Sequence, residues 1–168
     1  MRLFVSIPLS DDMKLSLANV QSFLKKQGVR GSFTPVENLH ITLAFIGEYP
    51  DADYVSQALS GVCFSPFCLS LSGFGQFGNI WWAGLEKSPE LDKLAKKLRF
   101  SLERAGVPHD KKKFSPHMTL VRRAEGDPSA VVIPKASMQV KSFCLMRSDF
   151  AKRGMIYTPL AEFSAADK

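Results

Sequence analysis

Residues 40–43 read His-Ile-Thr-Leu and residues 117–120 read His-Met-Thr-Leu, so one four-residue pattern occurs twice in the chain. The chain holds only three histidines and four threonines, and the repeat uses two of each. Apolar, strand-forming residues follow both copies, which predicts that each motif is a strand. Because residues i and i+2 of a strand share one face, each histidine should point the same way as the threonine of its motif. The two apolar residues of each motif should then point into the core.

The remaining sequence predicts an α+β fold with largely antiparallel sheets. Ser10 and Ser88 each begin a helix, because acidic residues follow a capping hydroxyl and apolar residues then recur at helical spacing. These helices should end at Gly28 and Gly106, and a further helix is expected over residues 51–62. Strand-like segments surround the helices without steady alternation of strand and helix, which argues against a parallel sheet. Two strands that each offer an imidazole and a hydroxyl suggest a site with internal two-fold symmetry.

Length and composition indicate one domain over residues 1–168, or two small lobes that share one core. Apolar residues make up 45% of the chain, which is normal for a globular protein. The apolar runs are too short to span a bilayer, and the N-terminal run is too short for a signal peptide. The three cysteines form no C-x-x-C pair and are expected to be free thiols of a cytoplasmic protein. We expect a monomer that has no membrane partner.

The basic charge of the chain favours a polyanionic partner, with nucleic acid first. The formal net charge is +6 and the sequence pI is about 9.3. Basic residues stand beside the second motif, at residues 111–113 and 122–123, and again at residues 152–153. Each basic run alone is typical of a solvated turn. The inference of a polyanionic partner therefore depends on the runs at residues 111–113 and 122–123, which flank the second motif.

Two histidines can serve as general base and general acid on opposite sides of one phosphorus atom, as in-line hydrolysis of a phosphodiester requires. The hydroxyls of Thr42 and Thr119 would reach the same space and could donate hydrogen bonds to the non-bridging oxygens. A metal site is not predicted, since neither motif has a carboxylate or cysteine at ligand spacing and H-E-x-x-H is absent. We therefore expect neither a metal nor another cofactor.

Other interpretations of the sequence are weaker. The G-x-S-x-G pattern of a serine nucleophile is absent. Residues 73–78 match the glycine spacing of a dinucleotide loop but lead into a strand-like run at residues 80–83, which predicts a hairpin turn. A lone histidine on a half-buried strand is usually structural, and His109, outside both motifs, is expected to be a loop residue. The repeat of the motif in a basic chain favours a catalytic pair.

The paired motifs, together with three longer stretches, resemble the 2H phosphoesterase superfamily. These stretches are Arg-Leu-Phe-Val at residues 2–5, Pro-Val-Glu-Asn-Leu-His-Ile-Thr-Leu-Ala-Phe-Ile-Gly at residues 35–47 and Phe-Ser-Pro-His-Met-Thr-Leu at residues 114–120. Within the superfamily the chain looks most like the prokaryotic RNA 2′,3′-cyclic phosphodiesterases, also called 2′-5′ RNA ligases, and residues 145–160 are similar to their C-terminal hairpin. The resemblance implies a single bilobal domain over residues 1–168, in which two antiparallel sheets line a central cleft with pseudo-two-fold symmetry and helices lie outside.

The same resemblance implies the reaction and its substrates. These are RNA 2′,3′-cyclic phosphate ends or nucleoside 2′,3′-cyclic phosphates, hydrolysed to 2′-phosphates without a metal ion. For a 3′-oxygen leaving group we assign His117 as the base and His40 as the acid, and the sequence leaves the reverse assignment open. Two alternatives remain: a 2′-5′ RNA ligase that runs the reverse reaction on RNA ends, and a non-catalytic RNA-binding module. Residues 124–137 are short and proline-bearing where relatives should have a helix, so the preferred RNA length stays open.

The resemblance also carries roles over to individual residues. It makes the two motif histidines catalytic and the two motif threonines phosphate-binding. It suggests Arg122 as a further phosphate contact, although Arg123 would share the face of the second histidine in a regular strand. A bulge after Leu120 would resolve this conflict, so we choose Arg122 and keep Arg123 as the second choice. Apart from the resemblance, Phe45, or an aromatic residue between Phe74 and Trp82, is a candidate for stacking on a base, with core packing as the alternative.

Overall fold

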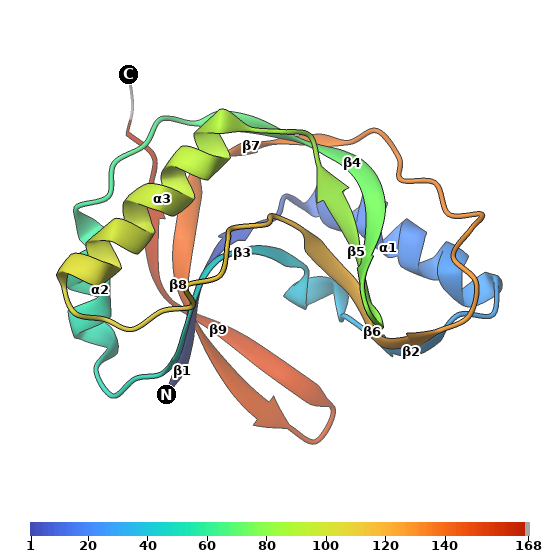
Figure 1. Cartoon of the computed structure of the whole chain (residues 1–168), viewed down its shortest axis with the longest axis horizontal. Helices are drawn as coiled ribbons and strands as arrows, with labels where there is room; N and C mark the ends of the chain where they lie inside the picture. The colour runs from blue at the N-terminus through green and yellow to red at the C-terminus, as the bar shows by residue number, and fades with distance from the viewer. Residues whose placement is uncertain (167–168) are drawn as a thin grey trace.

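The computed structural model describes residues 1–166 and has an α+β fold with two antiparallel sheets (Figure 1). The first sheet has the strand order β3-β1-β8-β9, and the second has the order β2-β6-β5-β4-β7. Each described strand pairing is antiparallel, as predicted. One motif lies on each sheet, because β3 begins at His40 and β6 begins at Met118.

The first sheet carries the motif of residues 40–43. Helices α2 and α3 contact each other, and they contact β9 and β3 respectively, so they cover this sheet from outside (Figure 1). The elements of this half are β3 (His40–Glu48), β1 (Arg2–Pro8), β8 (Ser142–Ala151), β9 (Gly154–Ser164), α2 (Ala52–Ser60) and α3 (Pro89–Arg104).

The second sheet carries the motif of residues 117–120. Helix α1 packs on β6, and a short 3-10 helix, η1, leads from β2 into β3. β4 turns into β5 at residues 78–79, which confirms the predicted hairpin, but residues 73–77 of the glycine segment are strand and not turn. Gly75 pairs with Trp82 in this ladder, where a Cβ atom would clash with the Trp82 ring. The elements of this half are β2 (Arg30–Phe33), β6 (Met118–Glu125), β5 (Ile80–Leu85), β4 (Phe67–Phe77), β7 (Ser137–Val140), α1 (Asp11–Lys26) and η1 (Val36–Asn38).

The helix starts follow from the capping serines. The side chains of Ser10 and Ser88 accept hydrogen bonds, at 3.2 and 3.1 Å, from the backbone amides three residues later. Gly28 and Gly106 follow the two helices with φ angles of +87° and +72°, which glycine adopts without a side-chain clash. Among the described residues, every helix falls short of the length and apolarity that a bilayer crossing needs.

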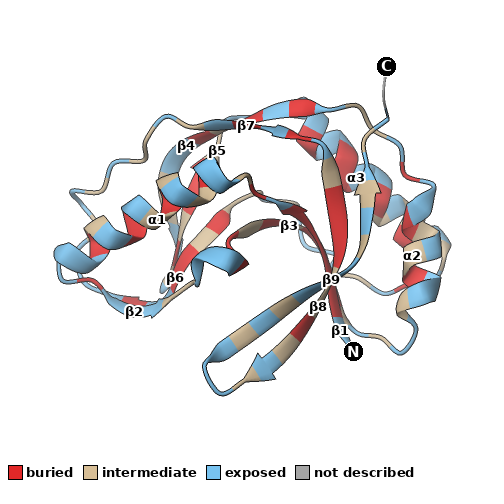
Figure 2. Ribbon diagram, turned by 180° about the vertical axis from the view of Figure 1, so that it is seen from behind, coloured by how far each residue is buried: buried red, intermediate tan, exposed pale blue. Residues whose placement is uncertain are grey.

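The apolar residues of both motifs lie in the core. Ile41, Leu43, Met118 and Leu120 have no exposed surface, whereas the histidines and threonines of the motifs stay partly exposed. Figure 2 shows buried residues along the strands and on the helix faces that pack against the sheets. The alternation predicted from the two motifs is therefore confirmed.

The β8–β9 hairpin extends past the strand beside it. The pairing of β1 with β8 begins at Arg2 opposite Ser148, while β8 and β9 stay paired up to a two-residue turn of Lys152 and Arg153. Residues 149–156, which we call the hairpin arm, therefore project from the sheet as two strands alone (Figure 1).

Candidate active site

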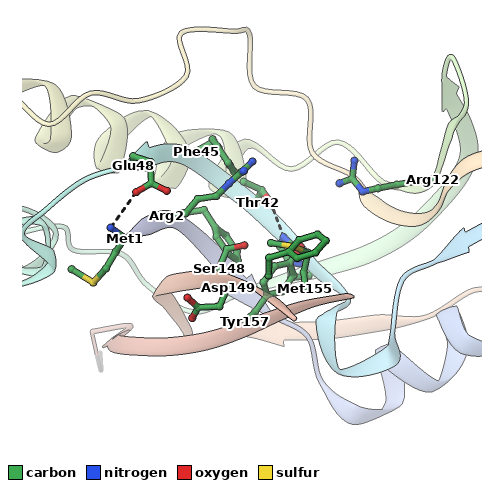
Figure 3. A pocket seen from close by; sticks show the side chains of 13 residues that line it. Met1, Arg2, Thr42, Phe45, Glu48, Arg122, Ser148, Asp149, Met155 and Tyr157 are labelled. Carbon is green, nitrogen blue, oxygen red and sulfur yellow. Dashed lines mark hydrogen bonds and ion pairs between the residues drawn. The ribbon is translucent and has the colours of Figure 1, made fainter. Parts of the chain in front are cut away.

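A cavity of about 690 Å³ lies beside the motif of β3 (Figure 3). A volume of this size falls within the range of about 300–1,000 Å³ that is usual for ligand sites. The first residues of the chain form one part of its wall, and the β8–β9 hairpin between residues 148 and 157 forms another. The rest of the wall comes from β3 and β6, which contribute His40, Thr42, Phe45, Glu48 and Arg122.

Both ring nitrogens of His40 have partners. The Nδ1 atom lies 2.6 Å from the carbonyl oxygen of Asn38, and the Nε2 atom lies 2.8 Å from the hydroxyl oxygen of Thr42. Because a carbonyl only accepts, Nδ1 donates, and the neutral ring keeps its lone pair on Nε2, where it accepts from the Thr42 hydroxyl. The nitrogen available for proton transfer is therefore Nε2, on the side of the threonine.

The pKa of His40 lies below the usual histidine value of 6.5. Burial is the largest cause, since the ring packs against Phe4 (5.2 Å between ring centroids) and edge-on against Tyr157 (5.4 Å). The backbone hydrogen bond to Nδ1 opposes this effect, while the charges of Arg122 and His117 lower the pKa of His40 further. In the free protein His40 is therefore neutral at pH 7.

His117 is held in the same way on the second sheet. Its Nδ1 atom lies 2.7 Å from the carbonyl oxygen of Ser115, which again stands two residues before the histidine. The rings of Phe77 and Trp82 pack beside it, with centroids 5.2 and 5.8 Å from that of His117. The carbonyl bond fixes the tautomer, so Nε2 is the nitrogen of His117 that can accept or give a proton.

The two motifs approach each other from the two sheets. β3 contacts β6, and the charge of His117 acts on the pKa of His40. His117 and Thr119 lie outside the wall of the cavity, whereas Arg122 is part of it. The fold thus brings His40, Thr42 and Arg122 into one cavity and places His117 within electrostatic range.

A bulge in β6 explains why Arg122 faces the cavity. The pairing of β5 with β6 skips Leu120, which is one residue more than the opposite strand offers. Leu120 and Val121 are consecutive, yet both are fully buried, so the alternation of faces shifts by one residue after them. Arg122 therefore lines the cavity, and Arg123, the second choice, does not.

The backbone around this bulge is tightly packed. Arg123 has a φ angle of +52°, the only positive value at a non-glycine residue in the part of the chain that the structure describes. On β2, Gly31 has a φ angle of +152°, and a Cβ atom there would meet both the Arg122 carbonyl oxygen and Val121 Cγ2 at 2.7 Å. A glycine is required for β2 to approach the bulge this closely.

Phe45 lines the cavity and is 37% exposed. The guanidinium group of Arg2 lies over its ring, 5.1 Å from the centroid, so a cation already contacts the ring that was expected to stack on a base. Sequence reasoning missed Arg2 and Tyr157 as cavity residues. Arg2 could have been found, because it belongs to the stretch at residues 2–5, but nothing near Tyr157 in the sequence signals its packing on His40.

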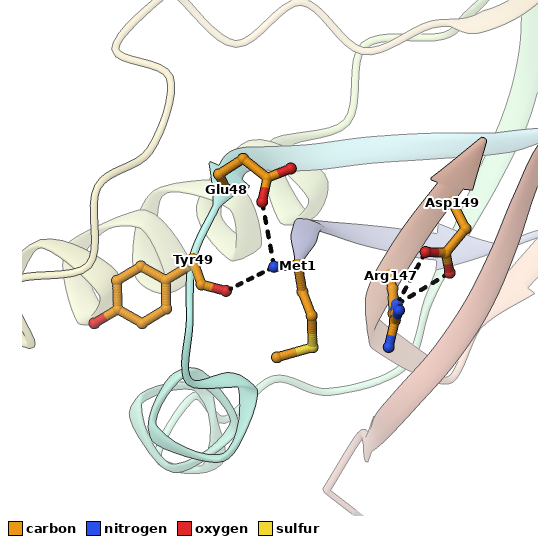
Figure 4. Close-up of polar contacts among 5 residues, drawn as sticks. All are labelled: Met1, Glu48, Tyr49, Arg147 and Asp149. Carbon is orange, nitrogen blue, oxygen red and sulfur yellow. Dashed lines mark hydrogen bonds and ion pairs between the residues drawn. The ribbon is translucent and has the colours of Figure 1, made fainter.

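The cavity wall is suited to an anion. Its carboxylates are paired: Glu48 with the Met1 ammonium group at 3.2 Å, and Asp149 with Arg147 at 3.0 Å (Figure 4). Imidazole, hydroxyl and guanidinium groups remain to face a ligand. Among residues 1–166, no three or more histidine, cysteine, aspartate or glutamate side chains are grouped to hold a metal ion.

Comparison with known proteins adds sequence and structural relatives. The family described as the 2′-5′ RNA ligase superfamily matches residues 17–150. A protein of Archaeoglobus fulgidus, named RNA 2′,3′-cyclic phosphodiesterase, is 34% identical over 97% of this chain and 99% of its own length. The structure of Escherichia coli LigT complexed with 3′-AMP has a TM-score of 0.83 at 31% identity, covering 99% of this chain and 98% of its own. TT0787 of Thermus thermophilus has a TM-score of 0.85 at 29% identity, covering 98% and 97%.

Proposed function

The chain belongs to the 2′-5′ RNA ligase superfamily, and from this membership we propose that it hydrolyses RNA 2′,3′-cyclic phosphate ends to 2′-phosphates with two histidines and no metal ion. It is a cyclic phosphodiesterase of the 2H phosphoesterase type, like its relatives. One observation carries the two-histidine part: His40 and Arg122 share a cavity, and His117 is near enough to influence the pKa of His40.

In the proposed reaction, the base takes a proton from water, and the water oxygen attacks phosphorus from the side opposite the 3′-oxygen. The bond from phosphorus to the 3′-oxygen breaks, the acid gives its proton to that oxygen, and the phosphate stays on the 2′-oxygen. We assign His117 as the base and His40 as the acid. Each proton transfer contributes typically about 10²–10⁴-fold in rate.

Substrate binding raises the pKa of His40, so that its ring takes up from solvent the proton that it needs as an acid. A bound phosphate anion offsets the charges of Arg122 and His117, both of which lower the pKa of His40 in the free protein. Once Nε2 carries a proton it no longer accepts from Thr42, whose hydroxyl can then donate to a non-bridging oxygen. Thr119 and the Arg122 guanidinium group hold the remaining charge of the phosphate.

The test of the reaction is incubation with an oligonucleotide that ends in a 2′,3′-cyclic phosphate, in excess EDTA. We expect full turnover to an end that carries its phosphate on the 2′-hydroxyl. Turnover that stops with the chelator and returns with an added metal ion would contradict the metal-free mechanism. Tight binding without any product would instead favour the RNA-binding module.

RNA pieces with 5′-hydroxyl ends, added to the same reaction, separate hydrolysis from joining. Under the proposed function the cyclic ends are consumed by water, and joined product stays a minor fraction. A joined 2′-5′ product that accounts for most of the consumed ends would assign the chain to the ligase alternative.

The roles of the two histidines can be separated with a substrate whose 3′-bridging oxygen is replaced by sulfur. A thiolate leaves without a proton, so the acid is dispensable for this substrate while the base is not. His40→Ala should therefore lose at least roughly 100-fold with the oxygen substrate but recover most of that loss with the sulfur substrate. His117→Ala should stay slow with both, and recovery of His117→Ala in its place would reverse the assignment.

A further inference from the structure

The hairpin arm is attached to the catalytic cavity at its base. The Nδ2 atom of Asn38 donates to the carbonyl oxygen of Met155 at 2.9 Å, and the Asn38 backbone carbonyl accepts from His40 Nδ1. Tyr157, just below the arm, packs edge-on against the His40 ring. Two strands alone are marginally stable in water, so these contacts and the first sheet fix the direction in which the arm points.

The arm exposes an aromatic ring beside two cations. Phe150 is 88% exposed, more than any other large apolar side chain among the described residues. The turn that follows it consists of Lys152 and Arg153, both exposed. An exposed aromatic next to basic side chains is what a single-stranded nucleic acid binds, because bases stack on the ring and the cations contact phosphates.

The catalytic cavity runs continuously to this ring. The same cavity of about 690 Å³ that holds His40 also includes Phe150 in its wall. Figure 3 shows Met155 of the arm and Arg122 in this wall. A 2′,3′-cyclic phosphate is the last group of an RNA strand, so the rest of that strand can leave the site only on the 5′ side. An RNA whose end reaches His40 can therefore continue through the same cavity to the arm.

The charges along this route favour a phosphate backbone. The two carboxylates in the wall, Glu48 and Asp149, have cationic partners at 3.2 and 3.0 Å (Figure 4). Arg2 stands at the base of the arm, opposite Ser148, with its guanidinium group over Phe45. The planar guanidinium group of an arginine can itself stack on a base.

We propose that the hairpin arm binds the nucleotides on the 5′ side of the cyclic phosphate, with Phe150 stacked on a base and Lys152 and Arg153 against phosphates. This inference rests on the proposed function and extends it, because it makes an RNA strand, not a free nucleotide, the preferred substrate. The enzyme should therefore have a higher kcat/KM for a cyclic-phosphate-ended oligonucleotide than for a nucleoside 2′,3′-cyclic phosphate.

The test compares kcat/KM for these two substrates in the parent protein and in Phe150→Ala. We expect the variant to lose about fivefold or more with the oligonucleotide, the usual contribution of one stacked base, and to lose far less with the nucleoside cyclic phosphate. Phe150→Trp should keep the oligonucleotide rate, because any large aromatic ring can stack. Phe100→Ala is the matched control, since Phe100 is 60% exposed on α3 and outside this cavity.

The two cations are tested through salt. Each lost phosphate contact should reduce the slope of log affinity against log salt by about 0.7 for a single strand. Binding of a 2′-phosphate-ended oligonucleotide, the reaction product, should therefore depend less on salt in the double variant Lys152→Ser, Arg153→Ser than in the parent protein.

The possible results distinguish a failure of RNA binding by the arm from a failure of the proposed hydrolysis. If neither the oligonucleotide nor the nucleoside cyclic phosphate is hydrolysed, the proposed function fails. If the oligonucleotide is hydrolysed but the parent shows no preference for it, or Phe150→Ala keeps that preference, the arm proposal alone is overturned. Phe150-dependent sedimentation with vesicles of anionic phospholipid, without an effect on RNA, would assign the arm to a membrane surface and also overturn it.

Discussion

At the scale of single residues, His40 and His117 share one anchoring bond but have different surroundings. Each donates from Nδ1 to a backbone carbonyl two residues earlier. His40 then accepts from Thr42 and stands in the wall of the cavity, while His117 lies against two aromatic rings outside it. A repeated motif therefore yields two imidazoles in unlike surroundings, as the proposed acid and base would require, because an acid and a base hold different protonation states at the same pH.

We expect bell-shaped pH profiles whose alkaline limb differs between kcat/KM and kcat. The proposed acid, His40, must carry a proton, so activity falls as the pH rises through its pKa. kcat/KM reports the free enzyme, in which burial lowers the pKa of His40 from its usual value of 6.5, so this limb should lie at lower pH than in kcat. kcat reports the complex, in which a bound phosphate anion should raise the pKa of His40. Initial rates with a nucleoside 2′,3′-cyclic phosphate across the pH range give both profiles.

His109→Gln is the control for this profile. Burial also lowers the pKa of His109, but this side chain lies in the loop after α3 and outside the catalytic cavity. The variant should reproduce both limbs of the parent profile. Alkaline limbs that coincide in kcat and kcat/KM would contradict proton uptake by His40 on binding.

The two neighbouring arginines should differ sharply. Arg122→Ala should lower kcat/KM by roughly 10-fold or more, because it removes a charge-assisted contact to the phosphate. Arg123→Ala should change kcat/KM by less than about threefold, since Arg123 lies outside the cavity wall. Steady-state kinetics of both variants measure the difference. Equal losses of kcat/KM would show that Arg123 also contacts the phosphate.

At the scale of elements, the site depends on an irregular strand. The extra residue at Leu120 turns Arg122 toward the cavity, and Gly31 on β2 leaves room for the backbone of that bulge. Bulges near active sites commonly re-aim a side chain in this way. The part of β6 before the bulge positions Thr119, and the bulge itself positions the guanidinium group of Arg122.

Gly31→Ala should lower both stability and activity. Its φ angle of +152° and the 2.7 Å approach of a new Cβ atom to the Arg122 carbonyl oxygen should cost at least about 1 kcal/mol in the free energy of unfolding. The same displacement should reduce kcat/KM by moving Arg122. Gly61→Ala is the matched control, because nothing lies within 4 Å of a Cβ atom there. Urea unfolding and steady-state kinetics check both effects, and a Gly31→Ala protein with parent-like activity would show that the bulge can shift without moving the arginine.

At the scale of the whole molecule, one buried amide ties the two motifs together. Gln21 of α1 is only 5% exposed, and its Nε2 atom donates to the carbonyl oxygens of Thr34 and Leu120 at 2.8 and 3.0 Å. Leu120 belongs to the second motif, and Thr34 begins the segment that leads into the first. This side chain therefore helps to hold the two histidine strands in their mutual position.

Gln21→Leu should destabilise the protein by about 1–3 kcal/mol, because two buried carbonyls lose a donor while the volume changes little. The variant should also lower kcat for the cyclic phosphate if the position of the strands matters for the reaction. Gln57→Leu, on the exposed surface of α2, should leave the free energy of unfolding nearly unchanged. Denaturant curves for the two variants provide the comparison, and equal stability of both would remove Gln21 from this role.

The features that could be predicted from the sequence are those with local signals. The motif strands, the helix starts at Ser10 and Ser88 and the turn at residues 78–79 each depend on a few adjacent residues, and the structure confirms them. The α+β fold with two antiparallel sheets is also confirmed.

Features that join distant parts of the chain could not be predicted. The hydrogen bond from Asn38 to Met155 and the packing of Tyr157 on His40 depend on how β9 lies beside the first motif. The bulge could be anticipated only as a way to bring Arg122 into the site, because strand alternation by itself points to Arg123. The stretch at residues 2–5 includes Arg2, but its position opposite Ser148 depends on the register of β1 against β8, which no short stretch encodes.

The pairing of β1 with β8 ends at Ser148, which allows the length of the hairpin arm to change. Beyond that point no third strand constrains β8, so residues can be inserted in matched pairs near Lys152 and Arg153 without disturbing the sheet. One added residue per strand would turn the tip side chains to the opposite face, whereas two would restore them about 7 Å farther out. The hairpin arm can therefore be lengthened only by an even number of residues per strand. Such an insertion would move the proposed RNA contacts at the tip farther from His40 and leave the residues around the cyclic phosphate in place.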